Sequence, residues 1–282
     1  MNYLEWCPHT DLISPNWRNF FKHPLFLYNI DIEEELGLQG TLMIYITGDM
    51  HAGLKKETAR PKFIESLTSQ DTLIVLGDFG YTWNKQILKE YNYEVPTFVI
   101  DGNHENYTIL NDCPNTPMLG GEVGVIKNRV YRLHTGEVYE FNGLKVFVFG
   151  GALSIDKDYR IPYVSWWPEE IPTMKEYNRA LENLEKANWD IDLFLAHTCS
   201  EEVCEEFFNY PYKITDPTEK MISQLEAEIK NHNPNSDYKF LFGHHHSLRL
   251  SQKYISLYTE TVRVNKNSEG INLELVRYPY ED

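Results

Sequence analysis

The chain lacks any long apolar run, and it is poor in cysteine. No stretch approaches the ~18 consecutive apolar residues of a membrane-spanning helix. The opening segment, "MNYLEWCPHTDLISPNW", has no basic region followed by an apolar one, so it does not have the pattern of a signal peptide. The four cysteines show no CxxC spacing and are sparse for 282 residues: Cys7, Cys113, Cys199 and Cys204. We therefore expect a reduced, cytoplasmic protein without a membrane partner.

Positive charge is also scarce. The chain has 26 Lys and Arg residues against 42 Asp and Glu residues, which gives a formal net charge of −16, and it has no basic run. Such a surface repels polyphosphate backbones unless bound metal ions reverse the local sign, so extended nucleic-acid binding is not expected. Chain ends and small phosphate esters stay open as substrates, and the oligomeric state stays unknown.

The length and the hydrophobic content of 42% are sufficient for a large folded domain. No internal repeat, low-complexity tract or linker divides the chain. We expect one domain over residues 41–282, preceded by an N-terminal extension over residues 1–40. The extension carries an acidic cluster, "DIEEE" (31–35). It is either an arm packed on the domain or an artificially early chain start.

Six short apolar runs, rich in Val, Ile and Phe, predict buried strands of an α/β fold. They cover residues 42–47, 72–77, 96–101, 145–150, 192–197 and 239–244. Three further segments predict helices: 55–67, 173–187 and 216–230. The last of them begins with Asp-Pro and places Glu219 three residues after Asp216, as in a capping box. Two alternating segments, 253–265 and 270–279, predict a closing hairpin or a sheet edge.

Five of the six predicted strands end in side chains of the metal-ligand type. In chain order these are Asp49 and His51, then Asp78, then Asn103, His104 and Glu105, then His197, and finally His244 and His246. Three of these strand ends include a glycine, which lets the backbone turn sharply. Because ligands gather at the carboxyl ends of strands in α/β sheets, we expect these side chains to meet in one site.

Two pairs of these residues have a spacing that lets both members reach one cation. In Asp49-x-His51 and His244-x-His246, residues two apart point to the same side of an extended segment. His245 then points away, as a supporting or rim residue. The donors are carboxylate, imidazole and amide groups, which suit Mn²⁺ first and Fe, Zn²⁺ or Ni²⁺ as alternatives.

The order of these blocks resembles that of the calcineurin-like metallophosphoesterases. The blocks are Asp-x-His, Gly-Asp, Gly-Asn-His-Glu, His and Gly-His-x-His, and they extend from Gly48 to His246. The resemblance implies a sandwich of two mixed β-sheets flanked by helices, with a dinuclear metal centre at one edge. It also implies a first metal held by Asp49, His51, Asp78 and His246, and a second held by Asp78, Asn103, His197 and His244. In this comparison Asp78 bridges the two metals, and His104 matches the family's catalytic histidine.

The resemblance implies a hydrolase of phosphomono- or phosphodiester bonds in small-molecule or nucleotide-like substrates. A metal can lower the pKa of bound water from about 16 to about 7, and the resulting hydroxide attacks phosphorus. His104 would then protonate the departing alkoxide.

The second block departs from the protein-phosphatase branch of the family, which continues Gly-Asp-x-x-Asp-Arg-Gly. Here the text is "GDFGY" (77–81), so Tyr81 replaces the carboxylate that orients the catalytic histidine, and the phosphate-binding arginine is missing. The stretches "GDFGYTW" and "GGALSIDKDYR" are similar to bacterial and phage-type members. Arg160 and Lys157 are the candidates to replace the missing arginine, against the equally weighted alternative of a solvated charged loop.

Trp166 is a candidate for stacking on a base or aryl group, although a Trp166–Trp167 pair more often belongs to a core or a lid. Three functional alternatives remain. A Ser/Thr-type protein phosphatase is disfavoured by the missing Asp and Arg, and a phosphodiesterase acting on nucleic-acid ends is disfavoured by the acidic charge. A non-catalytic scaffold of the same fold is expected to lose ligands, whereas this chain keeps all seven ligand positions and His104.

Overall fold

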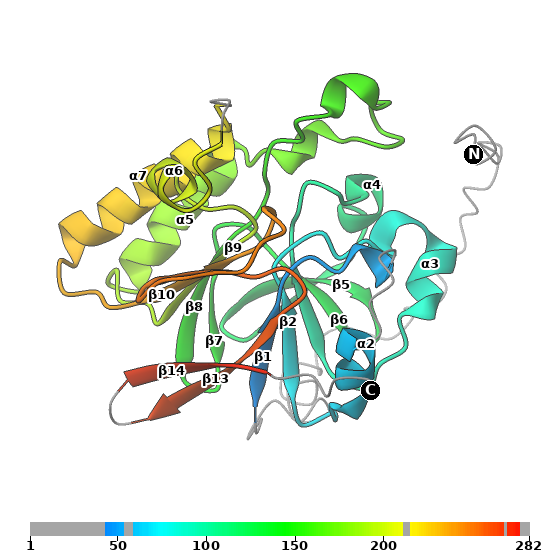
Figure 1. Cartoon of the computed structure of the whole chain (residues 1–282), viewed down its shortest axis with the longest axis horizontal. Helices are drawn as coiled ribbons and strands as arrows, with labels where there is room; N and C mark the ends of the chain where they lie inside the picture. Colours follow the sequence, from blue (N-terminus) through cyan, green and yellow to red (C-terminus); the bar gives the residue numbers. More distant parts are fainter. Residues whose placement is uncertain (1–42, 54–58, 211–214, 268–269, 277–282) are drawn as a thin grey trace.

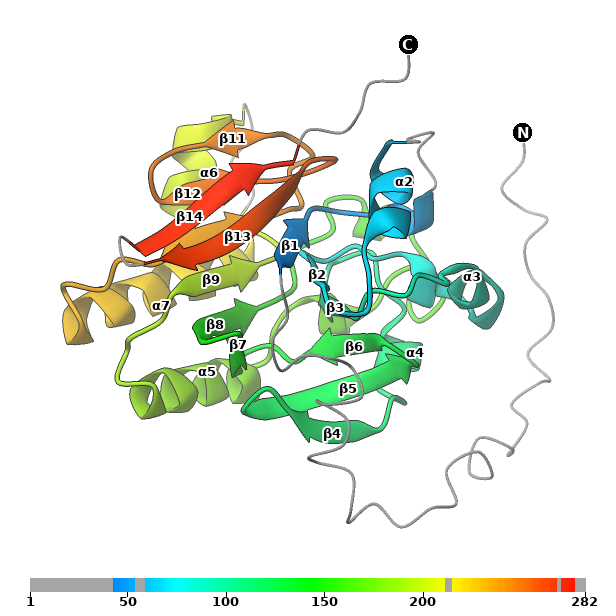
Figure 2. The same cartoon turned by 90° about the horizontal axis from the view of Figure 1, so that it is seen from below.

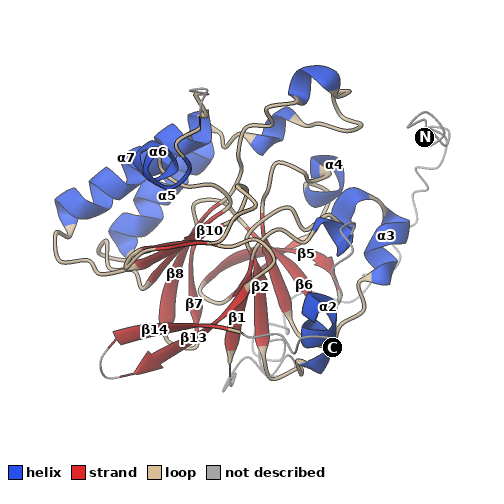
Figure 3. Ribbon diagram, viewed as in Figure 1, coloured by secondary structure: helices blue, strands red, loops and turns tan. Residues whose placement is uncertain are grey.

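The computed structural model describes residues 43–53, 59–210, 215–267 and 270–276. Its strands form two mixed sheets that pack face to face, with helices outside them (Figures 1 and 3). This is the expected α/β sandwich of two sheets. The expected extension over residues 1–40 lies outside the described residues.

The larger sheet has eight strands in the order β14-β13-β1-β2-β3-β6-β5-β4. Its centre, from β1 to β6 in that order, is parallel, and its two edges are antiparallel. The strands are β1 (Ile44–Thr47), β2 (Thr72–Val75), β3 (Thr97–Ile100), β4 (Asn115–Met118), β5 (Gly121–Lys127), β6 (Val130–Leu133), β13 (Thr261–Asn267) and β14 (Gly270–Leu275).

The smaller sheet has six strands in the order β11-β12-β10-β9-β8-β7. Its inner strands, from β12 to β8, are parallel to one another, and β11 and β7 are antiparallel edges. The strands are β7 (Val138–Phe141), β8 (Leu144–Phe149), β9 (Leu193–Ala196), β10 (Lys239–Phe242), β11 (Arg249–Leu250) and β12 (Tyr254–Ser256).

Helices cover the outer face of each sheet. Figure 2 shows α2 and α3 on one side of the molecule and α5, α6 and α7 on the other. The helices are α2 (Ala59–Ser66), α3 (Lys85–Glu90), α4 (Tyr107–Leu110), α5 (Met174–Lys186), α6 (Glu201–Phe208) and α7 (Pro217–His232). Short 3₁₀ turns are η2 (His51–Gly53), η3 (Tyr81–Trp83), η4 (Lys157–Tyr159) and η5 (Pro168–Glu170).

Apolar side chains fill three layers, one between the sheets and one beneath each group of helices. In β2, Ile74 faces the layer between the sheets, whereas Leu73 and Val75 face the layer under α2 and α3. Both faces of such a strand are buried, and this is why its sequence is a continuous apolar run rather than an alternating one. Each fully buried side chain of this kind stabilises the fold by about 1.5–3 kcal/mol.

The elements expected from the sequence are largely confirmed. All six predicted strands form, as β1, β2, β3, β8, β9 and β10, and the predicted helices form as α2, α5 and α7, although residues 55–58 lie outside the described residues. β13 and β14 form an antiparallel hairpin at the edge of the larger sheet. The predicted segment 253–265 is not one unit, because its first part is β12 of the smaller sheet and its last part belongs to β13.

The start of α7 confirms one sequence signal and corrects another. Asp216 is the N-cap, and its carboxylate accepts hydrogen bonds from Thr218 N at 2.7 Å and Leu153 N at 2.8 Å. Glu219 does not complete a capping box there, because its carboxylate lies beside Thr198 Oγ1, at 3.5 Å. A complete capping box is instead found at the start of α5, between Thr173 and Glu176.

The carboxyl ends of β1, β2 and β3 in one sheet and of β9 and β10 in the other meet at the same edge of the sandwich, at the top of Figure 1. The loops that follow these strands carry the side chains singled out in the sequence. In the described part of the chain, no helix has the length and apolar character needed to cross a membrane.

Candidate metal centre

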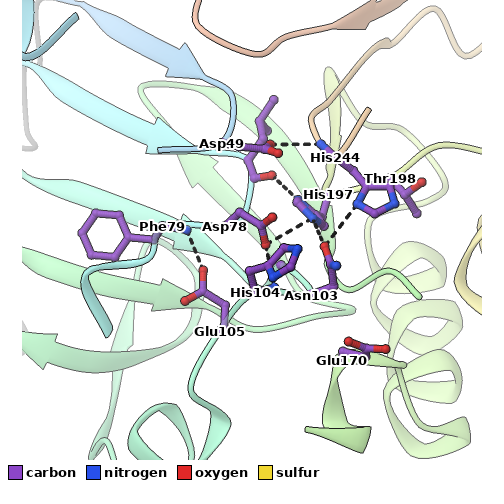
Figure 4. A network of polar contacts seen from close by, with 12 residues as sticks. Asp49, Asp78, Phe79, Asn103, His104, Glu105, Glu170, His197, Thr198 and His244 are labelled. Carbon is purple, nitrogen blue, oxygen red and sulfur yellow. Dashed lines mark hydrogen bonds and ion pairs between the residues drawn. The ribbon is translucent and has the colours of Figure 1, made fainter. Parts of the chain in front are cut away.

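Seven side chains from five strand ends come together at this edge. They are Asp49, His51, Asp78, Asn103, His197, His244 and His246. Figure 4 shows the carboxylates of Asp49 and Asp78 turned toward His197 and His244. Most of the seven are buried or half-buried, whereas His246 is exposed. The site therefore faces the protein interior on one side and solvent on the His246 side.

Glycines at the strand ends make room for these side chains. A Cβ atom on Gly243 would lie 2.2 Å from Asp49 Oδ1, and one on Gly102 would lie 2.3 Å from Asp78 Oδ1. A Cβ atom on Gly77 would lie 2.2 Å from His197 Nδ1, and Gly77 also has a φ of +87°. Real Cβ atoms do not approach other heavy atoms this closely, so a larger residue at any of these positions would displace one of the seven side chains.

The backbone at the site adopts conformations that L-residues rarely occupy. Positive φ angles occur at His51 (48°), Asp78 (48°), His244 (64°) and His246 (48°). Each costs of order 1–3 kcal/mol and persists only where the surrounding structure fixes it. Four such residues in one set of seven indicate that the fold holds these side chains in place at a cost in stability.

The first group of donors comes from the ends of β1, β2 and β10. His51 Nε2 lies 3.1 Å from His246 Nε2, and His246 Nε2 lies 2.9 Å from Asp49 Oδ2. Asp78 Oδ2 lies 3.7 Å from His51 Nε2. One donor atom of each of the four residues lies within 4.8 Å of all the others, as metal ligands must.

The second group shares Asp78 with the first. Asp78 Oδ1 lies 3.5 Å from His197 Nε2. Asn103 Oδ1 lies 2.9 Å from His197 Nε2 and 3.1 Å from His244 Nδ1. The two carboxylate oxygens of Asp78 therefore point in two directions, one toward each group.

The geometry and the charge of both groups fit divalent cations. Two ligand atoms at about 2.0–2.2 Å from a shared ion lie roughly 2.9–3.6 Å apart, and the closest nitrogen and oxygen pairs here fall in that range. Asp49 Oδ2 is buried without an aligned hydrogen bond from any described residue. Burial, together with the neighbouring Asp49 carboxylate, raises the pKa of Asp78 well above its usual range. Two buried carboxylates side by side repel each other as anions, and a cation bound between them would offset that repulsion.

A family profile described as calcineurin-like phosphoesterase matches residues 42–248. That range covers most of the chain and includes all seven residues. The chain belongs to the calcineurin-like phosphoesterase family. It is therefore a metal-dependent hydrolase that acts on phosphoric ester bonds.

Comparisons with individual proteins are less informative than the family profile. A phosphopantetheinyl hydrolase from Mycobacterium tuberculosis is among the similar solved structures, with 16% sequence identity and a TM-score of 0.40. The similarity covers 77% of this chain and 88% of that chain. A comparison with curated proteins found no match.

A second layer of this phosphoesterase orients the amide of Asn103. Asn103 Nδ2 donates to Ser154 Oγ at 3.0 Å, and Ser154 Oγ donates to Glu170 at 2.6 Å. Because the amide nitrogen is committed to Ser154, Oδ1 faces the two histidines. Glu170 is fully buried, and Figure 4 shows it at the far end of this network. No sequence signal distinguishes Glu170 from its exposed neighbour Glu169, because which of the two is buried depends on how the loop folds.

Two further contacts in this layer fix the loops after β2. His197 Nδ1 lies 2.7 Å from the Leu76 carbonyl oxygen and donates to it, so Nε2 is left to face the centre. Glu105 accepts hydrogen bonds from Phe79 N and Thr82 Oγ1, both at 2.6 Å, and burial raises the pKa of its carboxyl to about 8. Glu105 therefore holds the "GDFGYTW" loop and does not join the seven donors.

His104 lies beside the centre, and it is oriented by a residue other than Tyr81, which stands where the protein-phosphatase branch has the orienting carboxylate. Arg160 Nη1 lies 2.8 Å from His104 Nδ1, and Arg160 Nη2 lies 2.7 Å from Asp156 Oδ2. Tyr81 is buried and packs on Phe79, with ring centroids 5.0 Å apart. Arg160, rather than a carboxylate or Tyr81, holds the imidazole of His104.

The other two candidate substrate residues are not joined to the centre by any described contact. Lys157 is exposed in η4, and Trp166 is half-buried. Trp167 is buried in the layer under α3, where its Nε1 donates to Thr108 Oγ1 at 2.9 Å. Trp167 is therefore a core residue and not part of a substrate-binding surface.

His245 points away from the centre, as the alternation predicts, but it is not a rim residue. Its ring stacks on Phe208, with centroids 4.1 Å apart, and its Nε2 lies 3.6 Å from Cys199 Sγ. His245 therefore contacts the buried thiol of Cys199 on the side away from the centre. The strand-end pattern does not predict this contact.

Proposed function

We propose that this family member is a dinuclear phosphoesterase that hydrolyses phosphomono- or phosphodiester bonds of small-molecule or nucleotide-like substrates. The observation that supports this most strongly is the position of Asp78, whose Oδ2 faces His51 and whose Oδ1 faces His197. One cation would be held by Asp49, His51, Asp78 and His246, and the other by Asp78, Asn103, His197 and His244. The oxygen and imidazole donors suit Mn²⁺, with Fe, Zn²⁺ or Ni²⁺ as alternatives.

When bound, the two cations would supply a water nucleophile activated near neutral pH and positive charge opposite the non-bridging phosphate oxygens. The chain's own contribution is to hold the seven donors in place before substrate arrives. Three features serve that purpose. Glycines at the strand ends pack closely against the donors, and four of the seven donor residues have left-handed backbone. The Asn103–Ser154–Glu170 network orients the amide of Asn103. Little reorganisation is then needed when phosphate binds.

We assign leaving-group protonation to His104. A guanidinium only donates, so Nδ1 of His104 accepts from Arg160 and the ring proton of the neutral imidazole lies on Nε2. Nε2–H can donate to the departing oxygen. Complete proton transfer to the departing oxygen requires the doubly protonated ring, so Nδ1 must first take up a proton from solvent, which the Arg160 contact disfavours. Arg160 would therefore transfer its hydrogen bond from His104 to a non-bridging phosphate oxygen when substrate binds.

The alternatives are supported less well. In the protein-phosphatase branch a carboxylate orients the histidine, whereas here Arg160 is the partner and the corresponding Tyr81 is buried. Binding along a nucleic-acid duplex would have to overcome a net charge of −16. Small esters and nucleotides do not carry that electrostatic cost.

The proposal is tested with Mn²⁺-loaded protein on paired substrates. A monoester and a diester with the same aryl leaving group, together with cyclic nucleotides, would be hydrolysed in parallel with and without chelator. We expect chelator-sensitive hydrolysis of at least one class, and loss of it in Asp78→Asn. If the Mn²⁺-loaded wild-type protein is folded and cleaves none of these esters, the proposed function is wrong.

A further inference from the structure

A second cluster of ligand-type side chains lies behind the centre, on the opposite side of the loops that carry it. We call it the thiol–histidine cluster, and it consists of Cys199, Cys204 and His245. Cys199 follows β9, Cys204 lies in α6 and His245 follows β10. One donor atom of each lies within 4.8 Å of the other two. None of the three belongs to the seven donors described above.

The closest distance in the cluster fits a tetrahedral metal site. Cys199 Sγ lies 3.6 Å from His245 Nε2. A zinc ion bound at about 2.3 Å to sulfur and about 2.0–2.1 Å to nitrogen places these two ligand atoms roughly 3.6 Å apart when the angle is tetrahedral. The side chains therefore already have the separation that a shared ion needs.

The ring of His245 is oriented so that one nitrogen is left for a ligand. Tyr210 Oη lies 3.1 Å from Nδ1 and can accept its proton, and the ring stacks on Phe208. Metal-binding histidines almost always donate the second ring nitrogen to a partner of this kind, which fixes the tautomer. The lone pair of Nε2 then faces Cys199 Sγ, at 3.6 Å, and Thr198 Oγ1, at 3.3 Å, whose hydroxyl a metal ion would displace from that nitrogen.

A fourth donor is within reach. Glu219, in α7, is almost fully buried, and its carboxyl lies near the Cys204 thiol and 3.5 Å from Thr198 Oγ1. No lysine or arginine is paired with it among the described residues. A carboxyl buried without a cation keeps its proton, and a metal ion at the cluster would stabilise its ionised form as a ligand.

We propose that Cys199, Cys204 and His245 bind a structural Zn²⁺ ion, with Glu219 placed to complete a tetrahedral set. Two thiolates with an imidazole and a carboxylate select Zn²⁺ over Mn²⁺, so this site differs in chemistry from the oxygen-rich centre. Cys199 lies two residues after His197, and His245 lies between His244 and His246. The ion would therefore hold together, from behind, the two loops that supply three of the seven donors.

Cobalt spectroscopy tests the site separately from the phosphoesterase centre. Reduced, metal-free protein would be titrated with Co²⁺ while the thiolate-to-cobalt charge-transfer absorption is followed. The centre of the proposed function has no thiolate and cannot give this band. We expect the full intensity of the band to correspond to about one thiolate-bound Co²⁺ per chain, whatever further Co²⁺ the phosphoesterase centre takes up. It should disappear in Cys204→Ser and remain in Cys113→Ser, a matched control because Cys113 is a free, half-buried cysteine outside the cluster.

The Asp78→Asn variant distinguishes failure of this site from failure of the proposed function, because it should keep the band while losing Mn²⁺-dependent hydrolysis. A wild-type chain that binds Co²⁺ without the band overturns the site, and so does a band that persists in Cys204→Ser.

Alkylation of the wild-type protein tests the zinc site without relying on variants that could fail to fold. Iodoacetamide labelling, mapped by mass spectrometry, should show Cys199 and Cys204 protected by Zn²⁺ and Cys113 labelled equally with or without it. Equal labelling of all three cysteines in the folded protein with and without Zn²⁺ would contradict the site. A Cys199–Cys204 disulfide that, once reduced, takes up no Zn²⁺ would identify a redox pair instead.

Discussion

At the scale of single residues, the site depends on which atom of each side chain is left to face the centre. His197 uses Nδ1 on the Leu76 carbonyl, and Asn103 uses its amide nitrogen on Ser154, so each presents its remaining donor inward. His104 is held in the same way by Arg160. Orientation by a second hydrogen bond is what lets a small set of residue types form a defined site.

His104→Ala should separate leaving-group protonation from phosphate binding. An aryl oxide such as p-nitrophenolate departs without a proton, whereas an alkoxide needs one in the transition state. We expect kcat for alkyl esters to fall by ~10²–10⁴-fold and kcat for aryl esters to fall far less, at unchanged metal content. Equal losses for both esters would mean that His104 binds or stabilises phosphate, and the acid would then have to be another group.

Gly243→Ala should damage the centre by steric conflict alone, because Gly243 has no positive φ. The added Cβ would lie 2.2 Å from Asp49 Oδ1 and 3.0 Å from Leu76 O. We expect weaker Mn²⁺ binding and a loss of about 1–3 kcal/mol in the free energy of unfolding. Gly124→Ala is the control, since its Cβ would meet nothing closer than Arg132 Cβ at 3.3 Å. Similar Mn²⁺ affinities in the two variants would refute the steric account.

At the scale of elements, the strand ends bring the site together and the helices hold the loops between them. Asp216 illustrates this, because one carboxylate caps α7 and also binds Leu153 N in the loop that contains Ser154. The start of α7 is thereby tied to the network that orients Asn103.

Asp216→Ala should therefore lower the free energy of unfolding by more than the loss of an ordinary helix cap does. Removing a cap costs typically about 1 kcal/mol, and leaving the Leu153 N–H without a partner adds about 1–3 kcal/mol. Thr173→Ala, at the exposed capping box of α5, should lose only the contribution of the cap, about 1 kcal/mol. Urea unfolding of both variants measures the difference. Equal destabilisation would show that the Leu153 contact does not contribute.

The strands and helices that sequence reasoning found share strong local signals, and those it missed do not. The six predicted strands are apolar on both faces, whereas β4 (Asn115–Met118) and β5 (Gly121–Lys127) contain Pro, Gly and polar residues and take their form from pairing with neighbours. Helices α3 and α4 are only one or two turns long, too short for a periodic pattern. The meeting of the seven donor side chains was predictable because their chemistry coincides with strand ends. Arg160 was predicted as a candidate for phosphate binding, but its contact with His104 was not, and neither was the network of Ser154 and Glu170, because these contacts depend on how a long loop folds back.

At the scale of the whole molecule, two sheets from different parts of the chain meet so that residues almost 200 positions apart touch. His51 and His246 are one such pair. The centre therefore exists only in the folded domain, which couples metal binding to folding.

Residues 1–40 should be dispensable for the chemistry, because every proposed ligand lies after Met43. A chain beginning at Met43 is expected to keep the Mn²⁺-dependent rate of the full chain, measured on the same ester at equal metal occupancy. If the shortened chain is folded and metal-loaded but inactive, the segment helps to build the active site.

The shared carboxylate of Asp78 is the central claim, and electron paramagnetic resonance of the Mn²⁺-loaded protein tests it most directly. The measurement uses the Cys204→Ser background, so that the thiol–histidine cluster does not contribute to metal content. We predict about two Mn²⁺ per chain with the spectrum of an exchange-coupled pair, and in Asp78→Asn loss of the coupling together with weaker Mn²⁺ binding at both positions. A single uncoupled Mn²⁺ in the parent, or a coupled pair that survives Asp78→Asn, would contradict the dinuclear account.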